Sequence, residues 1–384
     1  MKSPEVNIEV SIIDWVISQN NISNNIKELL QEVKNNKLKI TFKQLEDISK
    51  KINIPLGYFF LKQPPQENLN IIECRTIDSI ELENPSRDLV DTIYEMQNIQ
   101  DWMRDYLISN EFDKIDFIGS QKNQDDYNII ANSIREKLNI KMDWFLKCKN
   151  SSDLFKKLRF LLNEVGVLVM INGIVGSNNK RKLNLNEFRA FTLIDDFAPL
   201  IFINNNDSEN GKIFSLLHET VHIWLGIDSF YNDRYNDNIN VSDKENMCNK
   251  VAAEILVPKQ MFLKLWHSNN SNDLIETCNK LSKIFKCSKV VIARRALDNE
   301  FINQLEYNLI VKKSIEDYNL NKKNKSSGGD YYNTMLTRLD NNFIKALYCS
   351  VKEGKTQFTE AYRLTNTNRI TFDKLAEKVG GVKY

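Results

Sequence analysis

The stretch "FRAFTLIDDFAPLIFINNNDSENGKIFSLLHETVHIWLG", from Phe188 to Gly226, decides the fold. Its first part holds two apolar runs, "FRAFTLI" and "PLIFIN", separated by "DDFA", and this pattern predicts a β-hairpin. Its second part, "FSLLHETVHIWLG", has apolar residues at helical spacing and carries two of the three histidines in the chain. The stretch therefore predicts a hairpin followed directly by a helix that bears both histidines.

The two histidines belong to the pattern H-E-x-x-H, which has the spacing of a metal site. Residues four apart lie on one face of an α-helix, so His218 and His222 can bind one ion while Glu219 lies beside it. A catalytic zinc ion takes three protein ligands and keeps an open position for water, from which a neighbouring carboxylate removes a proton. The pattern therefore predicts zinc-dependent hydrolysis with one zinc ion and Glu219 as general base. The alternative is an apolar helix with two surface histidines.

A third ligand is expected downstream, in the run "DKENMCNKVAAEILVP". Glu245 and Glu254 are nine residues apart, so a helix places them on nearly opposite sides and only one of them faces the ion. Glu245 is the expected ligand, because Asn249 lies four residues later on the same face and can orient the ligands. Asp243 and Glu254 remain open as alternatives, and otherwise Glu254 has an outer or capping role.

The strand "PLIFIN" before the histidine helix has two interpretations. It is either a plain core strand or a strand that runs along the active-site cleft. In the second case an extended substrate pairs with its backbone, and the candidate substrate-strand residues are Phe202 and Ile203.

Most of the remaining chain shows helical periodicity, in short pieces near the N-terminus and in longer ones later. Proline residues at positions 55, 64 and 65 stop helix formation and place a first boundary near residue 68. The predicted class is mainly α with a small β-sheet, an α+β protein, and its H-E-x-x-H helix is typical of a zincin-like core flanked by helical N- and C-terminal domains. The expected domains are a helix-turn-helix-like domain at 1–68, a helical linker region at 69–150, the metallopeptidase core at 151–300 and a C-terminal helical domain at 301–384.

The amino-acid composition limits which binding partners and which cellular compartment are expected. With 52 basic and 51 acidic residues the net charge is +1, which provides no general attraction to nucleic acid or to a membrane surface. The six cysteines are scattered without a C-x-x-C pair, and we interpret them as ordinary small apolar residues of a protein in a reducing compartment. The N-terminus lacks a basic and then apolar signal pattern. A cytoplasmic location is therefore expected.

The stretch from Phe188 and the later run "ENMCNKVAAEILVP" together resemble the ImmA/IrrE family of zinc metallo-endopeptidases. A strand that ends in Asn, a Phe four residues before the first histidine, H-E-x-x-H and E-x-x-C-N-x-x-A-A-E-x-L-x-P occur in that order. The resemblance covers most of the chain and is strongest between Phe188 and Pro258. It implies that the zinc ligands are His218, His222 and Glu245, and that Glu219 is catalytic.

The N-terminal run "KITFKQLEDISKKINIPLGYFFLKQPP" resembles the second half of an Xre-type helix-turn-helix, and the C-terminal region is similar to the tail of the long family members. A DNA-reading helix needs basic side chains near its start. The equivalent run here, "NNISNNIKELLQEV", has one Lys, and residues 1–62 hold nine Lys against seven acids. We therefore expect a degenerate bundle that contacts protein rather than DNA.

The resemblance implies an endopeptidase that cleaves a regulatory protein, a helix-turn-helix repressor encoded by a neighbouring gene. Cleavage would relieve repression of a mobile-element, stress or defence operon. Long family members are also associated with toxin–antitoxin pairs, so the alternative is an antitoxin or regulatory binding module that neutralises a partner toxin without proteolysis. The enzyme is the preferred interpretation, because the predicted site is complete. The sequence leaves open whether the loop 226–243 covers the cleft.

Overall fold

The computed structural model describes residues 3–19, 22–65, 85–227, 229–231, 243–269, 273–322 and 331–380. Two compact units are present, one formed by Met1–Arg75 and Ser79–Tyr94, the other by Thr76–Asp78 and Glu95–Tyr384. The boundary expected near residue 68 lies outside the described residues, and the four predicted domains stay predictions. No helix among the described residues is long and apolar enough to cross a membrane.

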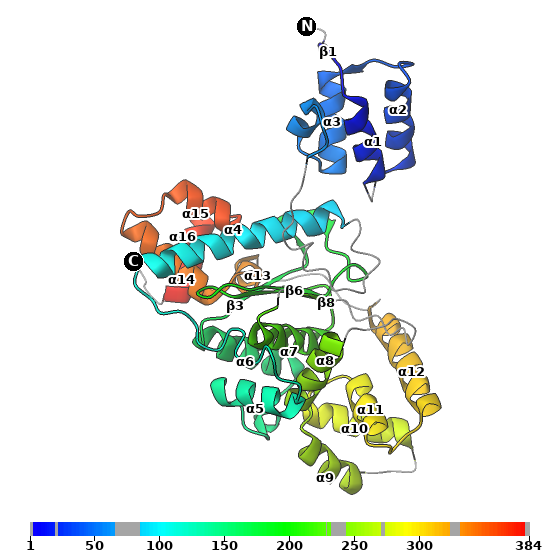
Figure 1. Ribbon diagram of the computed structural model, residues 1–384, viewed down its shortest axis with the longest axis vertical. Helices are drawn as coiled ribbons and strands as arrows, with labels where there is room; N and C mark the ends of the chain where they lie inside the picture. Colours follow the sequence, from blue (N-terminus) through cyan, green and yellow to red (C-terminus); the bar gives the residue numbers. More distant parts are fainter. Residues whose placement is uncertain are drawn as a thin grey trace. The chain divides into compact units, whose positions relative to one another are not determined.

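The N-terminal unit is a small helical bundle with its own core (Figure 1). It contains, in chain order, β1 (Glu5–Val6), α1 (Val10–Ser18), α2 (Asn24–Lys34), β2 (Ile40–Thr41), α3 (Phe42–Ile52) and the 3-10 helix η1 (Leu56–Phe60). A capping box starts α3, because the Thr41 side chain accepts a hydrogen bond from Gln44 N while Gln44 Oε1 accepts one from Thr41 N. The three helices form where the apolar spacing predicts them. Their assignment to the helix-turn-helix class stays a prediction.

The second unit is built on a four-stranded sheet. Its strands are β3 (Leu168–Asn172), β7 (Leu200–Asn204), β6 (Ala190–Leu193) and β8 (Ser229–Tyr231), hydrogen-bonded in that order. The β6 and β7 strands pair antiparallel with Phe191 opposite Phe202, which confirms the predicted hairpin. On the other side of β7, β3 pairs with it in parallel, and this strand is not predicted by the sequence. A separate small hairpin joins β4 (Ile174–Val175) to β5 (Asn178–Lys182).

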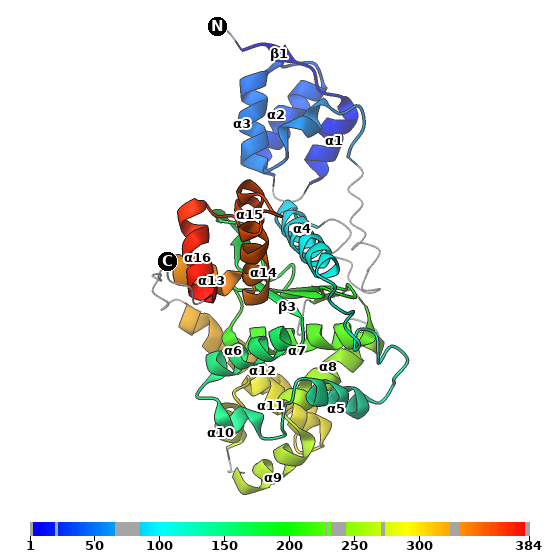
Figure 2. The same ribbon diagram turned by 90° about the vertical axis from the view of Figure 1, so that its left-hand side faces the viewer.

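Helices cover both faces of this sheet. The helices described from residue 87 onward, not all of which touch the sheet, are α4 (Arg87–Ser109), α5 (Tyr127–Lys137), η3 (Trp144–Lys147), α6 (Ser151–Glu164), α7 (Glu209–Leu225), α8 (Asp243–Leu256), α9 (Lys259–Asn269), α10 (Leu274–Phe285), α11 (Lys289–Asp298), α12 (Gln304–Lys322), α13 (Tyr331–Arg338), α14 (Asn341–Lys352), α15 (Phe358–Thr365) and α16 (Arg369–Gly380). Figures 1 and 2 show α6 and α7 on one side of the sheet, and α4 with α13 and α14 on the other. The α+β class predicted from the sequence is thus confirmed.

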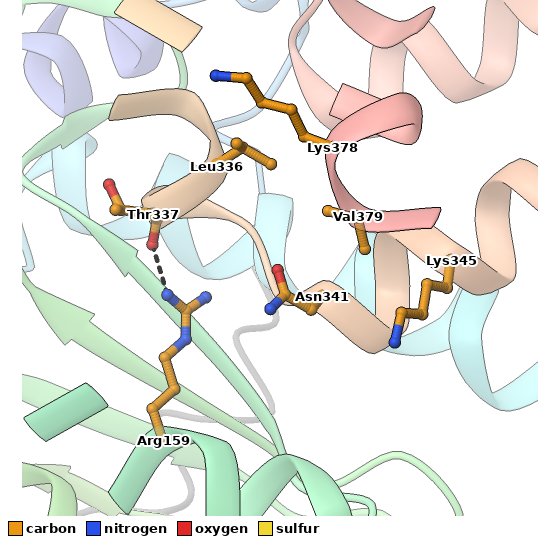
Figure 3. Close-up of a pocket in the computed structure, with 7 residues that line it drawn as sticks. All are labelled: Arg159, Leu336, Thr337, Asn341, Lys345, Lys378 and Val379. Atoms are coloured by element: carbon orange, nitrogen blue, oxygen red, sulfur yellow. Dashed lines mark hydrogen bonds between the residues drawn. The ribbon is translucent and has the colours of Figure 1, made fainter. Parts of the chain in front are cut away.

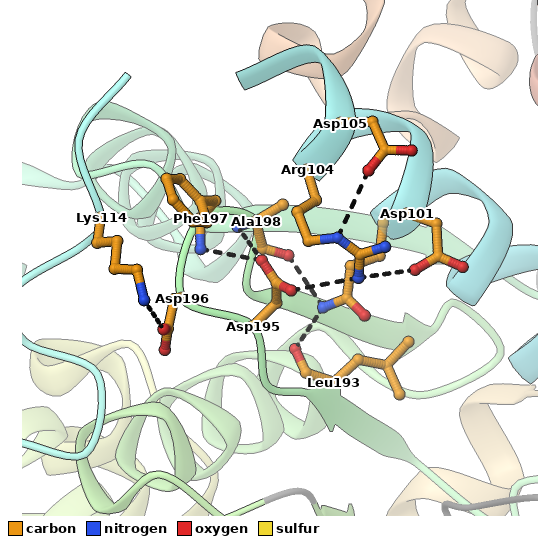
Figure 4. A network of polar contacts seen from close by, with 10 residues as sticks. Asp101, Arg104, Asp105, Lys114, Leu193, Asp195, Asp196, Phe197 and Ala198 are labelled. Carbon is orange, nitrogen blue, oxygen red and sulfur yellow. Dashed lines mark hydrogen bonds and ion pairs between the residues drawn. The ribbon is translucent and has the colours of Figure 1, made fainter. Parts of the chain in front are cut away.

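Polar contacts from α4 hold the turn between β6 and β7 (Figure 4). Gln100 Nε2 donates to the carbonyl oxygens of Leu193 and Ala198, at 2.9 Å each, from a buried position. Asp195 Oδ1 accepts from Ala198 N at 2.9 Å, and Asp195 Oδ2 lies 3.5 Å from Arg104 Nη1. These contacts satisfy backbone groups at the end of the hairpin and fix the strands that precede the histidine helix.

The position of β7 in the sheet contradicts the substrate-strand prediction. Phe202 and Ile203 lie on a strand that is hydrogen-bonded to β3 on one side and to β6 on the other. Both side chains are buried, with exposed fractions of 1% and 0%. Because the backbone groups of β7 are already paired, a substrate cannot add to this strand. Its plain role as a core strand is the correct one.

The C-terminal helices are joined to β3 through a buried acid. Asp340, at the start of α14, is fully buried and its Oδ2 accepts from Val169 N at 2.9 Å. From α6, Arg159 donates to the carbonyl oxygens of Thr337 and Leu339 at 2.8 and 2.6 Å. A cavity of ≈ 380 Å³ lies beside this contact and has no lining residue from α7 or α8 (Figure 3).

Candidate metal centre

The histidine helix α7 is fixed at both ends by local sequence. Ser208 caps its start, because the Ser208 hydroxyl accepts from Gly211 N at 3.0 Å. At its end Gly226 has a φ of 66°, a left-handed conformation that favours glycine. A Cβ at Gly226 would also lie 2.9 Å from Gly119 Cα, and Gly119 N donates to the carbonyl oxygen of Ile223 at 3.0 Å. The register of α7 against the rest of the unit is therefore well defined.

The three predicted metal ligands lie together. The Nε2 atoms of His218 and His222 are 3.1 Å apart. From α8, Glu245 Oε2 lies 3.0 Å from His218 Nε2, and its Oε1 lies 3.4 Å from His222 Nε2. Both histidines are buried, whereas the Glu245 side chain keeps 18% of its surface exposed. Two ring nitrogens and a carboxylate thus converge on one place.

The charges of this cluster shift the pKa values of its members. Burial acts to raise the pKa of Glu245, but its contacts with His218 and His222 hold that pKa well below its usual range. Burial acts to lower the pKa of His222, but the neighbouring Cys248 and Glu245 raise it well above the usual value. The negative charge of Glu245 and the positive charge of His222 thus favour each other.

Asn249 lies against the first histidine. Its Oδ1 is 3.0 Å from His218 Nδ1, one helical turn after Glu245 on α8. An acceptor at Nδ1 holds the proton of the ring there and leaves Nε2 free to bind a metal ion, which is the arrangement common among histidine ligands. The alternatives for the third ligand lie elsewhere: Asp243 is exposed at the start of α8, and Glu254 is paired with Arg295.

Glu219, the predicted general base, is fully buried beside the cluster. Its Oε2 accepts a hydrogen bond from Thr192 Oγ1 at 2.6 Å. Thr192 is fully buried on β6 and was not singled out from the sequence, because nothing in the run "AFTL" shows which side chain will meet the helix. The hairpin thus positions the carboxylate as well as the helix.

Cys248 is a second residue that the sequence interpretation missed. The scattered cysteine pattern predicts an ordinary small apolar residue here, yet the Cys248 Sγ and one imidazole nitrogen each of His218 and His222 lie within 4.8 Å of one another. Among the described residues these three form a group that could hold a metal ion. A signal was present in the sequence, since Cys248 stands three residues after Glu245, on the same side of α8.

The donor atoms of the cluster fit a divalent ion such as zinc. Two nitrogens bound to one tetrahedral zinc ion at about 2.1 Å are about 3.4 Å apart, and the two Nε2 atoms already lie 3.1 Å apart. Two imidazoles and a carboxylate are also a donor set that zinc prefers among common metals. The cluster therefore needs little rearrangement to accept the ion.

The cluster lies in a segment that is similar to a peptidase family. Residues 162–297 match the family described as the IrrE N-terminal-like domain, a peptidase family (M78). The segment that holds the cluster is therefore similar to a metallopeptidase domain. Residues 339–378 match a domain of unknown function (DUF8813). No curated protein and no solved structure matches the chain.

The matched segment contains the sheet, α7 and α8, so it supports the resemblance to the ImmA/IrrE family in this part of the chain. It also supports a metal-dependent, protease-like function. The helix-turn-helix nature of the N-terminal unit and membership of the long form of the family stay predictions.

Proposed function

We propose that the chain is a zinc-dependent endopeptidase. In this proposal His218, His222 and Glu245 bind the ion and Glu219 is the general base. The observation that carries it is the convergence of these three donors beside a buried carboxylate, within a segment similar to a peptidase family. A cluster whose donors all face one point, with no lysine or arginine among them, is better suited to bind a cation than to stabilise the fold.

The residues of the chain have distinct roles in this reaction. Zinc bound at the cluster supplies a positive charge that polarises the attacking water and the scissile carbonyl group. Glu219 accepts a proton from that water and passes it to the leaving amine. The Thr192 hydroxyl holds Glu219 through its 2.6 Å hydrogen bond, and Asn249 holds the ring of His218. Both act as positioning residues.

An extended substrate can bind by adding a strand to a sheet edge near the cluster. Among the described residues β8 pairs only with β6, so it is the last strand on that side of the sheet. Ser229 of β8 is opposite Thr192 of β6, the residue that contacts Glu219. We therefore propose that a substrate strand adds to β8 rather than to β7.

The substrate in this proposal is a regulatory protein encoded by a neighbouring gene, a helix-turn-helix repressor. Its cleavage would control transcription of a mobile-element, stress or defence operon. The alternative, an antitoxin that neutralises a toxin without proteolysis, differs in stoichiometry. An enzyme acts at substoichiometric amounts, whereas a neutralising module must bind its partner one to one.

The test uses Glu219→Gln, which keeps the shape of the side chain and removes its function as a base. Wild type, Glu219→Gln and the control Glu209→Gln are each co-expressed with the product of the neighbouring gene, and the partner is measured by intact mass. Glu209 lies in the first turn of the same helix and is exposed to solvent, so its variant controls for a charge change on α7.

We expect wild type and Glu209→Gln to cut the partner at one position and Glu219→Gln to bind it without cleavage. A partner that remains whole with all three proteins, in a stable equimolar complex, would support the binding module and remove the enzyme. Cleavage by Glu219→Gln at the wild-type rate would exclude Glu219 as the base.

A further inference from the structure

Cys248 occupies a position that the proposed reaction does not use. It lies on α8 three residues after Glu245 and one before Asn249, so all three face α7. Its side chain is fully buried, and its Sγ lies within 4.8 Å of the imidazole nitrogens of both His218 and His222. A thiol therefore stands beside the same two rings that Glu245 contacts.

Two other cysteines of the unit show what an ordinary buried thiol looks like. Cys278 and Cys287 are buried in the apolar core around α10 and α11. Burial raises the pKa of Cys278 to about 11 and raises that of Cys248 as well, so the pKa does not separate the two thiols. No histidine or carboxylate ligand joins them in a metal-type group among the described residues. The surroundings of Cys248 are of a different kind, because its neighbours are the proposed ligands.

The separation of the atoms suits a shared ion. A nitrogen and a sulfur bound to one tetrahedral zinc ion are about 3.6 Å apart. The Cys248 Sγ and one nitrogen of each ring lie within 4.8 Å of one another, so a side-chain shift of at most about one ångström brings the sulfur to this separation. Thiolate is also the softest ligand available to zinc in proteins and forms strong bonds with it.

We propose that Cys248 is a fourth protein ligand, so that the metal-bound resting site is closed by two histidines, Glu245 and the Cys248 thiolate. On binding, the thiol releases its proton to solvent and the sulfur occupies the position that hydrolysis reserves for water. The resting site is therefore inactive until the sulfur withdraws. The full burial of His218 and Glu219 agrees with a closed state. The inference rests on the proposed metal site and adds a regulation of that site.

The test detects the metal ligands directly, by absorption spectroscopy, and needs no substrate. The full-length protein is freed of metal with a chelator and loaded with Co²⁺, whose thiolate complexes absorb strongly in the near ultraviolet by sulfur-to-metal charge transfer. The variants are Cys248→Ala, the closer isostere Cys248→Ser, and the matched control Cys278→Ala, which removes a fully buried thiol from α10. Circular dichroism checks that each variant is folded.

We expect the charge-transfer band in wild type and in Cys278→Ala, and its loss in both Cys248 variants, which still bind one Co²⁺ per chain. Zinc binding to wild type should also release one proton more than binding to Cys248→Ala. Stoichiometric cobalt binding by wild type without the band would overturn the proposal and leave the histidine and glutamate site intact. Failure of wild type to bind cobalt at all would instead remove the proposed function.

A second measurement tests closure. Acetohydroxamate binds to an open coordination position and changes the visible spectrum of cobalt. We expect Cys248→Ala to bind acetohydroxamate at least tenfold more tightly than wild type or Cys278→Ala, on the order of 1.4 kcal/mol. Equal affinities would show that the sulfur does not block the site, and would remove the regulatory part of the proposal.

Discussion

The two glutamates at opposite ends of α8 have contrasting surroundings. Glu254 Oε2 accepts from Arg295, and its Oε1 accepts from Lys259 N at 3.1 Å, at the start of α9. Glu245 lies against His218 and His222, which carry no permanent charge. Glu254 is therefore paired with a permanent cation, the guanidinium of Arg295, whereas Glu245 faces two histidine rings.

This difference separates a structural cluster from a binding cluster. Glu254 needs no ligand, because the buried guanidinium of Arg295 and the backbone N–H of Lys259 donate to its two carboxylate oxygens. At Glu245 a carboxylate and two ring nitrogens converge, and only a proton or a metal ion can balance them. Cys248 and Glu245 raise the pKa of His222 against the opposing effect of burial, which agrees with a preference of this cluster for positive charge.

The largest expected effect is on the free energy of unfolding, when Glu254 is removed. Glu254→Ala leaves Arg295 buried without its carboxylate, and Arg295 has an exposed fraction of 6%. Removing one partner of a buried ion pair typically lowers the free energy of unfolding by about 3–5 kcal/mol. We expect a loss of this size in urea denaturation of the metal-free protein, and an unchanged zinc affinity in the fraction that remains folded.

The matched variant is Glu245→Ala, at the other end of the same helix. We expect a smaller loss of unfolding free energy in the metal-free protein, together with loss of the stabilisation that zinc gives to wild type. If Glu254→Ala abolishes zinc binding while the unfolding free energy is unchanged, the roles of the two glutamates have been assigned the wrong way round.

A smaller effect is expected at Asn249, which orients a ligand without binding the ion. Asn249→Ala removes the acceptor 3.0 Å from His218 Nδ1 and frees the ring to change tautomer. Zinc affinity should fall by about 10- to 100-fold, as for other partners of metal-binding histidines. Competition with a chromophoric chelator measures it. Asn246→Ala, an exposed asparagine on the same helix, should leave the affinity unchanged.

Local spacing explains which parts could be predicted from the sequence. The positions of His218, Glu219 and His222 on one helix, and of Glu245 and Asn249 on another, depend only on helical geometry and are found in the structure as expected. The β6–β7 hairpin was also predictable, because its strands are joined by a short turn. In each case the deciding interaction lies within a few residues.

Features that depend on distant parts of the chain could not be predicted. The run "LVMIN" of β3 is apolar up to Asn172 and shows no alternation, so periodicity cannot identify it as a strand. Its parallel pairing with β7 buries Phe202 and Ile203 inside the sheet, and the substrate-strand prediction failed for this reason. The contact between Thr192 and Glu219 joins residues 27 positions apart, and only the packing of the hairpin on α7 creates it.

The contact between Thr192 and Glu219 gives the smallest expected effect, and it tests the proposed general base specifically. Thr192→Val keeps the shape of the side chain and removes the donor to Glu219 Oε2. A hydrogen bond to a charged group contributes about 1.5 kcal/mol or more, so kcat should fall about tenfold while KM and zinc affinity are unchanged. The control is Thr220→Val, because Thr220 is equally buried on α7 but donates to the carbonyl oxygen of Leu216 at 2.7 Å. Equal losses of kcat in both variants would mean that buried threonine hydroxyls support the helix in general, and that Glu219 needs no specific partner to act as a base.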